Sequence, residues 1–481
     1  MSDAAQAQAA LLTAGQVAAA TGGELVQGAA ATAVCAVTSD SRAVEPEALF
    51  VALRGERFDG ARFCTAAAGA GASTVLVERA GWEAGLCAEL PPAVAVVAVA
   101  DSLRALGDLA AWHRRRFSAH VIGVTGSNGK TSTKEMIAAV LGGAPAVLHN
   151  RGNFNNLIGM PRSLLELGPQ HRWVVLEMGM NVPGEIARLA EVAAPEWGVL
   201  TNVHQVHLEG LGSLQAVATA KGELLEALPA GGAAVLNADD PLVLQQARRT
   251  RARQLTFGQS PAADVRVERM EPTPRGLAIG LRLAGGAVQF ELERIGAHNA
   301  MNAAAAAAVG QLAGLDAARI AERLARAPAP PMRMEVKRLG DLSLLVDCYN
   351  ANPRSVQIAL DSLGRLPASG PRLAVLGDMA ELGVAAEQLH RQVGRVAAEV
   401  GIDGLCTIGP LAAHIAAEAR RAGLAAVEQA ADLEGVLDWV ERQRAPGGWL
   451  LIKGSRRMRL ERLVTALVEP GAPERAGAGE P

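Results

Sequence analysis

Short apolar runs that end in polar residues recur along the whole chain. They include residues 121–125, 173–177, 199–203 and 233–237. Apolar positions spaced for one helical face lie between several of them, as at Met136, Ile137, Val140 and Leu141. Strands that alternate with helices predict parallel sheets of the α/β class, with functional side chains at the carboxyl ends of the strands.

Length and linker composition divide this pattern into three domains. A chain of 481 residues holds about three domains at roughly 150 residues each. The clearest linker is the proline-rich segment 326–331, where proline blocks helix continuation. We expect a small α/β domain at 1–117, a central domain at 118–328, a C-terminal domain at 329–468 and a disordered tail at 469–481.

Each domain has its own predicted elements. A short helix is expected over 11–20 and a longer one over 102–117. The central domain should be a parallel sheet of the phosphate-loop ATPase type, with a helix over 162–167. Alternation over 255–295 adds a small β insertion. The strands at 342–346, 373–376 and 449–452 predict a Rossmann-like, doubly wound C-terminal sheet.

Charge and cysteine usage exclude several classes of protein. The net charge of −3 is too close to neutral for a nucleic-acid or membrane surface. Five scattered cysteines without CxxC spacing argue for a reducing compartment. No apolar run approaches a membrane span, and residues 1–10 lack the basic start of a signal peptide. The expected location is therefore the cytoplasm.

The segment 121–132 carries the first candidate chemistry. An apolar strand leads through Gly123, Gly126 and Gly129 into Lys130-Thr131-Ser132 and a helix. A small-residue loop before a helix offers backbone N–H groups and positive potential to phosphates. The lysine would meet the terminal phosphates and the threonine hydroxyl would bind Mg²⁺. Val124 stands where the general pattern has glycine, so a glycine-rich turn with a chance lysine remains an alternative.

Further polar residues lie at other strand ends. Glu177 and His207 follow strands of the central domain, and Lys221 comes fourteen residues after the histidine. A carboxylate suits Mg²⁺, while a lone histidine is also typical of a structural role. The hydroxyl-rich segment 38–42 would bind a nucleotide or phosphate, or be a solvated turn. Because Ser/His/Asp, Cys/His and zinc patterns are absent from the sequence, charge stabilisation in phosphoryl transfer is favoured.

Taken together, the motifs resemble those of the Mur ligases, a family of three-domain ATP-dependent amide-bond ligases of peptidoglycan synthesis. The matching segments lie between about residues 10 and 468, at 123–131, 152–156, 177–181, 207–213, 220–223, 298–299, 347–352, 377–383 and 453–456. The resemblance is greatest to the branch that joins D-alanyl-D-alanine to UDP-MurNAc-tripeptide. It implies ATP, two Mg²⁺ ions, an acyl-phosphate intermediate, release of ADP and phosphate, and a monomer acting on small molecules.

The resemblance also implies roles for individual residues. Lys130, Lys221 and His207 would be catalytic, the second of them as a carbamylated lysine. The metal ligands would be Thr131, Glu177, His207 and Lys221. ATP would contact Gly126, Ser127, Asn128, Gly129, Lys130, Thr131, Ser132 and Arg333, and its adenine would contact Asn299 and Asn302. The UDP-sugar would be held by Ser39, Asp40, Ser41 and Arg42, and the substrate-side loop would contain Asn153, Asn155 and Asn156. The incoming dipeptide or ATP would meet Asp347, Asn350 and Asn352.

Two positions depart from the pattern of that branch. Leu157 stands where an acidic residue is expected, and Cys348 where a second aspartate is expected.

The nearest alternative function is that of the sister ligase that adds the third amino acid of the peptide. A nucleotide switch protein would release no phosphate in response to an acceptor, and a non-catalytic scaffold would bind no Mg·ATP.

Overall fold

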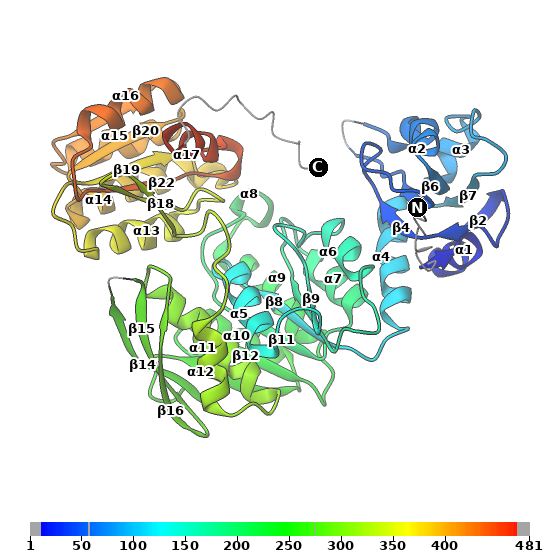
Figure 1. The fold of residues 1–481 in the computed structure, drawn as a ribbon, viewed down its shortest axis with the longest axis horizontal. Helices are drawn as coiled ribbons and strands as arrows, with labels where there is room; N and C mark the ends of the chain where they lie inside the picture. The colour runs from blue at the N-terminus through cyan, green and yellow to red at the C-terminus, as the bar shows by residue number, and fades with distance from the viewer. Residues whose placement is uncertain (1–10, 56–57, 274, 469–481) are drawn as a thin grey trace, which may run out of the picture. The chain divides into compact units, whose positions relative to one another are not determined.

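The computed structural model describes residues 11–55, 58–273 and 275–468, so the tail expected at 469–481 lies outside the described residues. The chain divides into two compact units. The first comprises Met1–Gly123, Ala144–Gly179 and Glu185–Glu196. The second comprises Val124–Gly143, Met180–Gly184 and Trp197–Pro481. Figure 1 labels their helices and strands.

The first unit contains a five-stranded sheet in the order β2-β7-β6-β5-β4. The strands from β4 to β7 are parallel neighbours, and β2 joins β7 antiparallel. Phe50, Val75 and Val96 build the core under its helices. The elements are β2 (Glu24–Gln27), β4 (Ala36–Thr38), β5 (Ala48–Val51), η1 (Gly60–Phe63), α2 (Cys64–Gly69), β6 (Ala72–Glu78), α3 (Arg79–Glu83) and β7 (Ala95–Val99).

The helix expected over 11–20 begins at Ala14 as α1 (Ala14–Thr21). Its start is fixed by Thr13, whose hydroxyl accepts the Gln16 N–H at 3.3 Å while the Gln16 side chain accepts the Thr13 N–H at 2.9 Å. This reciprocal cap satisfies two backbone donors at the helix start. The preceding residues form β1 (Leu12–Thr13), which pairs with β3 (Ala33–Val34).

The rest of the first unit holds α4 (Ser102–Arg114), β9 (Val147–His149), α6 (Gly159–Leu164), β10 (Trp173–Glu177) and α7 (Glu185–Ala193). The strands β9 and β10 are parallel. The helix expected over 162–167 begins and ends three residues earlier, as α6. Asn156 accepts the N–H groups of Ile158 and Gly159, and Pro161 fits the first turn because no intrahelical donor is needed there.

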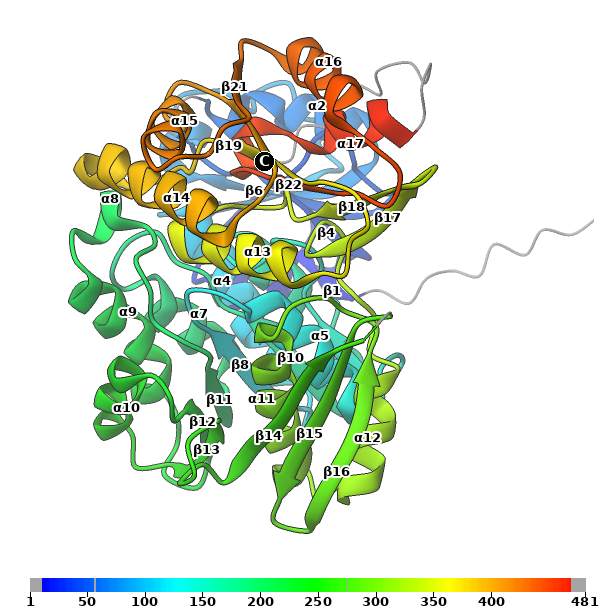
Figure 2. The same ribbon diagram turned by 90° about the vertical axis from the view of Figure 1, so that its left-hand side faces the viewer.

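The strand β8 (His120–Thr125) runs from the first unit into the second. There, β11 to β14 are parallel neighbours, and β14, β15 and β16 follow as an antiparallel meander (Figure 2). The expected β insertion therefore extends this sheet. The elements are α5 (Lys130–Leu141), β11 (Trp197–Leu200), α8 (Leu208–Leu211), α9 (Leu214–Glu226), β12 (Ala233–Asn237), α10 (Pro241–Gln246), η2 (Ala247–Arg249), β13 (Arg253–Gly258), β14 (Val265–Pro272), β15 (Leu277–Leu283), β16 (Gly286–Leu292), α11 (His298–Leu312) and α12 (Ala317–Ala325).

The C-terminal part of the second unit has a six-stranded sheet in the order β17-β18-β22-β19-β20-β21, parallel except at the edge strand β17. The elements are β17 (Glu335–Leu339), β18 (Leu342–Val346), α13 (Pro353–Arg365), β19 (Arg372–Gly377), η3 (Gly383–Ala385), α14 (Ala386–Val400), β20 (Gly404–Ile408), α15 (Ala412–Arg421), β21 (Val427–Ala430), α16 (Leu433–Gln443), β22 (Trp449–Lys453), η4 (Arg456–Met458) and α17 (Glu461–Val468).

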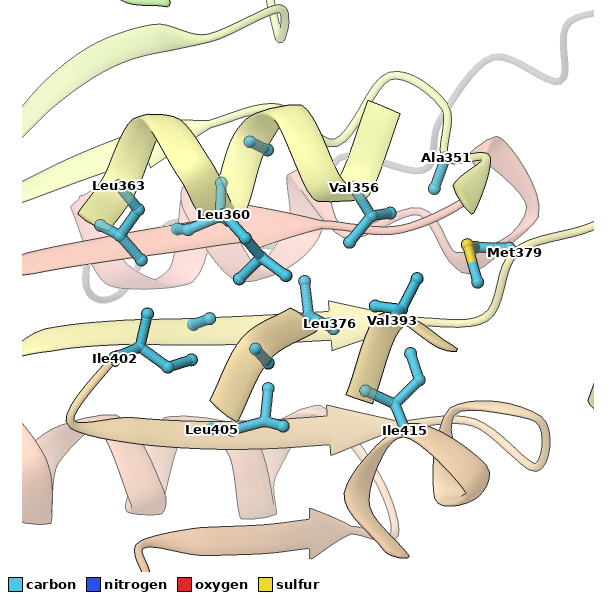
Figure 3. Close-up of a cluster of buried hydrophobic side chains, with 14 of the residues drawn as sticks. Ala351, Val356, Leu360, Leu363, Leu376, Met379, Val393, Ile402, Leu405 and Ile415 are labelled. Carbon is cyan, nitrogen blue, oxygen red and sulfur yellow. The ribbon is translucent and has the colours of Figure 1, made fainter. Parts of the chain in front are cut away.

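Alternate residues of these strands fill two separate cores, which confirms the doubly wound arrangement. Leu376 and Leu405 pack against α13, α14 and α15 (Figure 3). Val375 and Cys406 point to the opposite layer, where Trp439 of α16 is buried. Each fully buried large apolar side chain contributes about 1.5–3 kcal/mol. Among the described residues, no helix has both the length and the apolar character needed to cross a membrane.

Candidate active site

The loop between β8 and α5 has a shape that depends on two glycines. Gly126 and Gly129 have φ angles of 149° and 80°. A Cβ at position 126 would overlap the hydroxyl of Thr201, and one at position 129 would overlap the side-chain oxygen of Asn302. Only glycine therefore fits these positions without displacing a neighbour.

The end of β11 holds this loop in place. Asn202 accepts two loop donors, the Ser127 N–H through its carbonyl and the Asn128 N–H through its side chain, both at 2.9 Å. The Thr201 hydroxyl and the Asn202 side-chain amide donate to the Asn128 carbonyl at 2.7 and 3.0 Å. The Ser127 hydroxyl in turn accepts the N–H of His204 at 2.7 Å. The loop is thus part of the hydrogen-bonded end of the sheet.

In the predicted phosphate loop, some backbone N–H groups are already bonded within the protein, whereas those at the start of α5 lack intrahelical partners. The N–H groups of Ser127 and Asn128 are used inside the protein. Lys130 curls back over the loop, with its Nζ 2.9 Å from the Gly126 carbonyl. The helix α5 starts at this lysine, and the first turn of any helix lacks intrahelical partners for its N–H groups. The start of α5 is therefore the part of the loop suited to an anion.

A cavity of about 630 Å³ lies beside the loop, lined by Asn128, Gly129, Met301, Asn302 and Arg354 among others. Asn302 also accepts the Thr133 hydroxyl at 3.3 Å and donates to Asn299 at 3.3 Å. Asn299 is buried and donates to the Ile295 carbonyl. Of the two predicted adenine contacts, Asn302 lines the cavity, and the buried Asn299 accepts a hydrogen bond from it.

The same cavity is lined by His298, the first residue of α11. Its buried Nδ1 has no hydrogen-bond partner within the described part of the chain. Burial lowers the pKa of this imidazole to about 4, outweighing the attraction of Asp347, while the positive charges of Lys453 and Arg294 lower it further. The ring is therefore neutral at physiological pH.

Lys221 lies in the middle of α9, a helix whose start is capped by the Ser213 hydroxyl. Only 1 % of its surface is exposed. A buried ammonium requires compensating partners or a change in its chemical state. Burial, and to a lesser degree the positive charges of Arg354 and Lys221, lower the pKa of His204, which follows β11. Lys221 is therefore close enough to the end of β11 to act on it electrostatically.

His207 precedes α8 and has a left-handed backbone, with φ at 52°. Its Nδ1 lies 2.5 Å from Oε2 of Glu381, in the loop that follows β19. The hydrogen bond from the histidine lowers the pKa of this carboxyl group despite its partial burial. Residues far apart in the sequence thus meet at one point of the second unit.

Arg333 follows the proline linker and lies over the ring of Tyr349, with its guanidinium carbon 4.2 Å from the ring centroid. Its neighbours Met332 and Met334 both have positive φ angles, of 56° and 54°. Their N–H groups donate to Glu335 and Asp347. The arginine is therefore held by a specific local conformation.

The predicted contacts at the end of β18 have structural partners. Lys453 is 2 % exposed and donates to the Asp347 carboxylate at 2.6 Å and to the Asn350 carbonyl at 3.0 Å. Asn352 caps α13 and also donates to the side chain of Asn128 at 2.8 Å. This last bond joins the C-terminal sheet region to the loop between β8 and α5.

In the first unit, the loop after β4 carries the predicted sugar-nucleotide contacts Ser39 to Arg42. Its main feature is an ion pair within the loop, with Nη2 of Arg42 at 2.8 Å from Oδ2 of Asp40. The arginine side chain is 70 % exposed and the aspartate side chain 27 %. Hydrogen bonds from Arg42 lower the pKa of Asp40 to about 2.

Glu177 ends β10 in the same unit and is 2 % exposed. Asn155 donates to its Oε1 at 2.7 Å. Asn150 accepts its N–H and donates to its carbonyl, both at 2.9 Å. Asn156 instead supports the start of α6, and Asn153 accepts the Asn155 N–H at 2.6 Å. The asparagine-rich segment thus holds a buried carboxylate in one orientation.

The comparisons with known proteins agree with this arrangement. Family models match residues 34–114 (Mur ligase family, catalytic domain), 124–310 (Mur ligase middle domain) and 332–456 (Mur ligase, glutamate ligase domain). The UDP-N-acetylmuramoyl-tripeptide–D-alanyl-D-alanine ligase of Escherichia coli is 39 % identical over 93 % of this chain and 96 % of its own length.

The chain belongs to the Mur ligase family. Solved structures of related Mur ligases have the same fold. MurF from Acinetobacter baumannii matches with a TM-score of 0.85 at 30 % identity, over 95 % of this chain and 99 % of that chain. MurF from Thermotoga maritima in complex with ADP matches with a TM-score of 0.79 at 28 % identity, over 90 % and 96 % of the two chains.

Several residues of this candidate site were not among the sequence-based candidates. Thr201 and Asn202 hold the loop between β8 and α5, Asn150 brackets Glu177, and Lys453 pairs with Asp347. The signal for Asn202 was present, because polar residues at strand ends are the rule for such sites. Glu381 lies in the matched segment 377–383, but no sequence signal predicts its contact with His207, which lies 174 positions away.

Proposed function

We propose that this chain is an ATP-dependent ligase that joins D-alanyl-D-alanine to UDP-MurNAc-tripeptide, with release of ADP and phosphate. The observation that carries the proposal is the anchored loop with Lys130 at the start of α5, beside a cavity of about 630 Å³. The names of the E. coli and Acinetobacter relatives support the choice of substrates.

ATP would occupy this cavity, with its phosphates at the start of α5. Gly126 and Gly129 give the loop its shape, and Lys130 would offset the charge on the β- and γ-phosphates. Asn302 would face the base, with Asn299 behind it. Arg333, prepositioned on Tyr349, would add a further positive charge near the phosphates.

The donor set also fits Mg²⁺, which prefers oxygen ligands. Thr131 and Glu177 offer a hydroxyl and a carboxylate, and both are buried. We assign them to one ion and His207 to a second. An unmodified ammonium binds no cation, so Lys221 would contribute as a carbamate. The described residues contain no group of three or more His, Cys, Asp or Glu side chains that would hold a metal by themselves. Bound Mg²⁺ would supply charge neutralisation during phosphoryl transfer.

The proposed reaction has two steps. The γ-phosphoryl group passes to the terminal carboxylate of the peptide and gives an acyl phosphate. The amine of D-alanyl-D-alanine attacks its carbonyl carbon, and the tetrahedral intermediate collapses to the amide and phosphate. Lys130 stabilises the negative charge that moves between the oxygens, and a closed site excludes the water that would hydrolyse the acyl phosphate.

The remaining predicted contacts belong to the two other substrates. Ser39, Asp40, Ser41 and Arg42 would bind the UDP-sugar, and Asn153, Asn155 and Asn156 the same substrate closer to the reaction centre. Asp347, Asn350 and Asn352 would meet the dipeptide or ATP. We propose that the enzyme works as a monomer in the cytoplasm, where ATP and these small molecules are available.

The deciding experiment is acceptor-dependent release of ADP by the purified chain. UDP-MurNAc-tripeptide and Mg·ATP are combined with D-alanyl-D-alanine, diaminopimelate, lysine or no acceptor. We expect release with the dipeptide alone. UDP-MurNAc-dipeptide with diaminopimelate or lysine tests the sister ligase, and activity only there would replace our assignment. Nucleotide binding without acceptor-dependent release would instead favour a switch protein.

A further inference from the structure

Two loops of the second unit meet through one side-chain hydrogen bond. His207 stands before α8, and Glu381 lies between β19 and η3. Nδ1 of the histidine lies 2.5 Å from Oε2 of the glutamate, although 174 positions separate them in the sequence. The contact therefore depends on the C-terminal sheet region lying against the loop that follows β11.

The backbone supports this contact on both sides. His207 and Glu381 have φ angles of 52° and 62°, in a region that residues other than glycine and asparagine seldom adopt. The Glu209 N–H donates to the Glu381 carbonyl at 3.3 Å. Leu208 packs against the C-terminal core. Such unfavourable backbone conformations persist where the surroundings fix them, often at functional sites.

The chemistry of the pair fixes the state of the imidazole. A carboxylate accepts, so the proton between them belongs to Nδ1 of His207. In the neutral ring the lone pair then lies on Nε2. Carboxylates that accept one ring N–H of a histidine orient it for binding through the other nitrogen.

We propose that Glu381 is a positioning residue of the ligase reaction. From the C-terminal region, it holds His207 in the Nδ1–H tautomer and directs Nε2 to the metal-bound reaction centre. This role rests on the proposed function. It also gives the C-terminal region a direct chemical effect on the central site, because removing the carboxylate releases the ring.

The test compares Glu381→Ala, which removes the acceptor, with Glu381→Gln, whose side-chain oxygen still accepts from Nδ1. Glu428→Gln is the control, because this half-buried glutamate of β21 pairs with Arg442 and, among the described residues, is not bonded to His207. Kinetics with UDP-MurNAc-tripeptide, ATP and D-alanyl-D-alanine are combined with ring ¹⁵N spectra of histidine-labelled enzyme. His207→Gln assigns the signal.

We expect kcat to fall roughly 10- to 100-fold in Glu381→Ala, as for other residues that orient metal ligands. KM for ATP should stay within about threefold of the wild type, because the residues beside the nucleotide are intact. Glu381→Gln should recover most of the rate. The His207 spectrum should show the Nδ1–H tautomer in the wild type and in the glutamine variant, and a mixture in the alanine variant.

Two results would overturn the proposal. One is an unchanged kcat in Glu381→Ala. The other is a lower kcat with the His207 ring signals still those of the Nδ1–H tautomer, which would make the pair a contact between two parts of the fold only. The ring spectrum needs no turnover, so an enzyme inactive with these substrates would refute the proposed function and leave the positioning test intact.

Discussion

Two loops of this protein are candidates for binding a phosphorylated molecule, and they are built in opposite ways. The loop at 126–129 is tied to the end of β11 by the side chains and backbone of Thr201 and Asn202. The loop at 39–42 has an exposed ion pair between Asp40 and Arg42, two positions apart. The first is fixed by distant parts of the chain, the second mainly by itself.

The difference corresponds to the two tasks we assign to these loops. Stabilising charge in a transition state requires groups that are already in place, because reorganisation would cost part of the gain. Holding a large sugar nucleotide requires only binding, and an exposed arginine can exchange its internal partner for a phosphate. Substitutions in the first loop should therefore change kcat, and substitutions in the second should change KM.

The largest effect should come from Lys130→Ala. It removes the positive charge nearest the start of α5, and we expect kcat to fall by roughly 10²- to 10³-fold, the usual loss for one such donor. ADP release under saturating substrates measures this. The unfolding midpoint should stay at the wild-type value. A rate within threefold of the wild type would show that the fixed loop does not carry the chemistry.

The second effect concerns the partly buried histidine that lines the cavity. His298 has a pKa of about 4, below the ordinary 6.5, so the unfolded chain binds its proton first as the pH falls. Stability is complete above pH 6.5 and decreases between 6.5 and 4, by at most about 3 kcal/mol. His298→Gln should flatten this part of the curve of unfolding free energy against pH. An unchanged slope would mean that the histidine is solvated.

Thr201→Val tests the anchoring of the loop directly. The Asn128 carbonyl loses its 2.7 Å bond, which should lower stability by about 1–2 kcal/mol. A looser loop should also lower kcat roughly tenfold, since 1.4 kcal/mol corresponds to a factor of ten. Urea unfolding and initial rates measure the two effects. Thr219→Val in the exposed face of α9 is the matched control and should change neither.

The smallest effect is expected from Arg42→Ala. The exposed pair adds little to the fold, so the unfolding midpoint should not move. KM for UDP-MurNAc-tripeptide should rise roughly threefold to tenfold with kcat almost unchanged, as for a group that binds ground state and transition state equally. A fall in kcat with constant KM would remove the contrast between the two loops.

The sequence supplied the α/β class, the positions of most strands and the polar residues at their ends, because these depend on local periodicity. The predicted start of α6 was three residues too late. The apolar pattern shows neither the cap that Asn156 provides nor the fact that Pro161 is tolerated in the first turn of a helix. The strands β14 to β16 were expected, but their addition to the sheet of β11 to β13 depends on long-range pairing.

The candidate site shows the same limit. Lys130, Asn302 and Asn155 were predicted from motifs, yet Asn302 and Asn155 have hydrogen-bond partners in other segments of the chain. The bonds of Asn155 to Glu177 and of His207 to Glu381 span 22 and 174 positions. No pattern in one sequence connects such residues, because only the folded chain brings them together.

The ring that holds Arg333 also makes the protein convenient to observe. Tyr349 is the only tyrosine in the sequence, and its centroid lies 4.2 Å from the arginine guanidinium. A fluorinated tyrosine supplied during expression would therefore place a single ¹⁹F nucleus beside the linker, without altering any other position. Its resonance would follow this arginine through nucleotide binding and turnover in the native sequence.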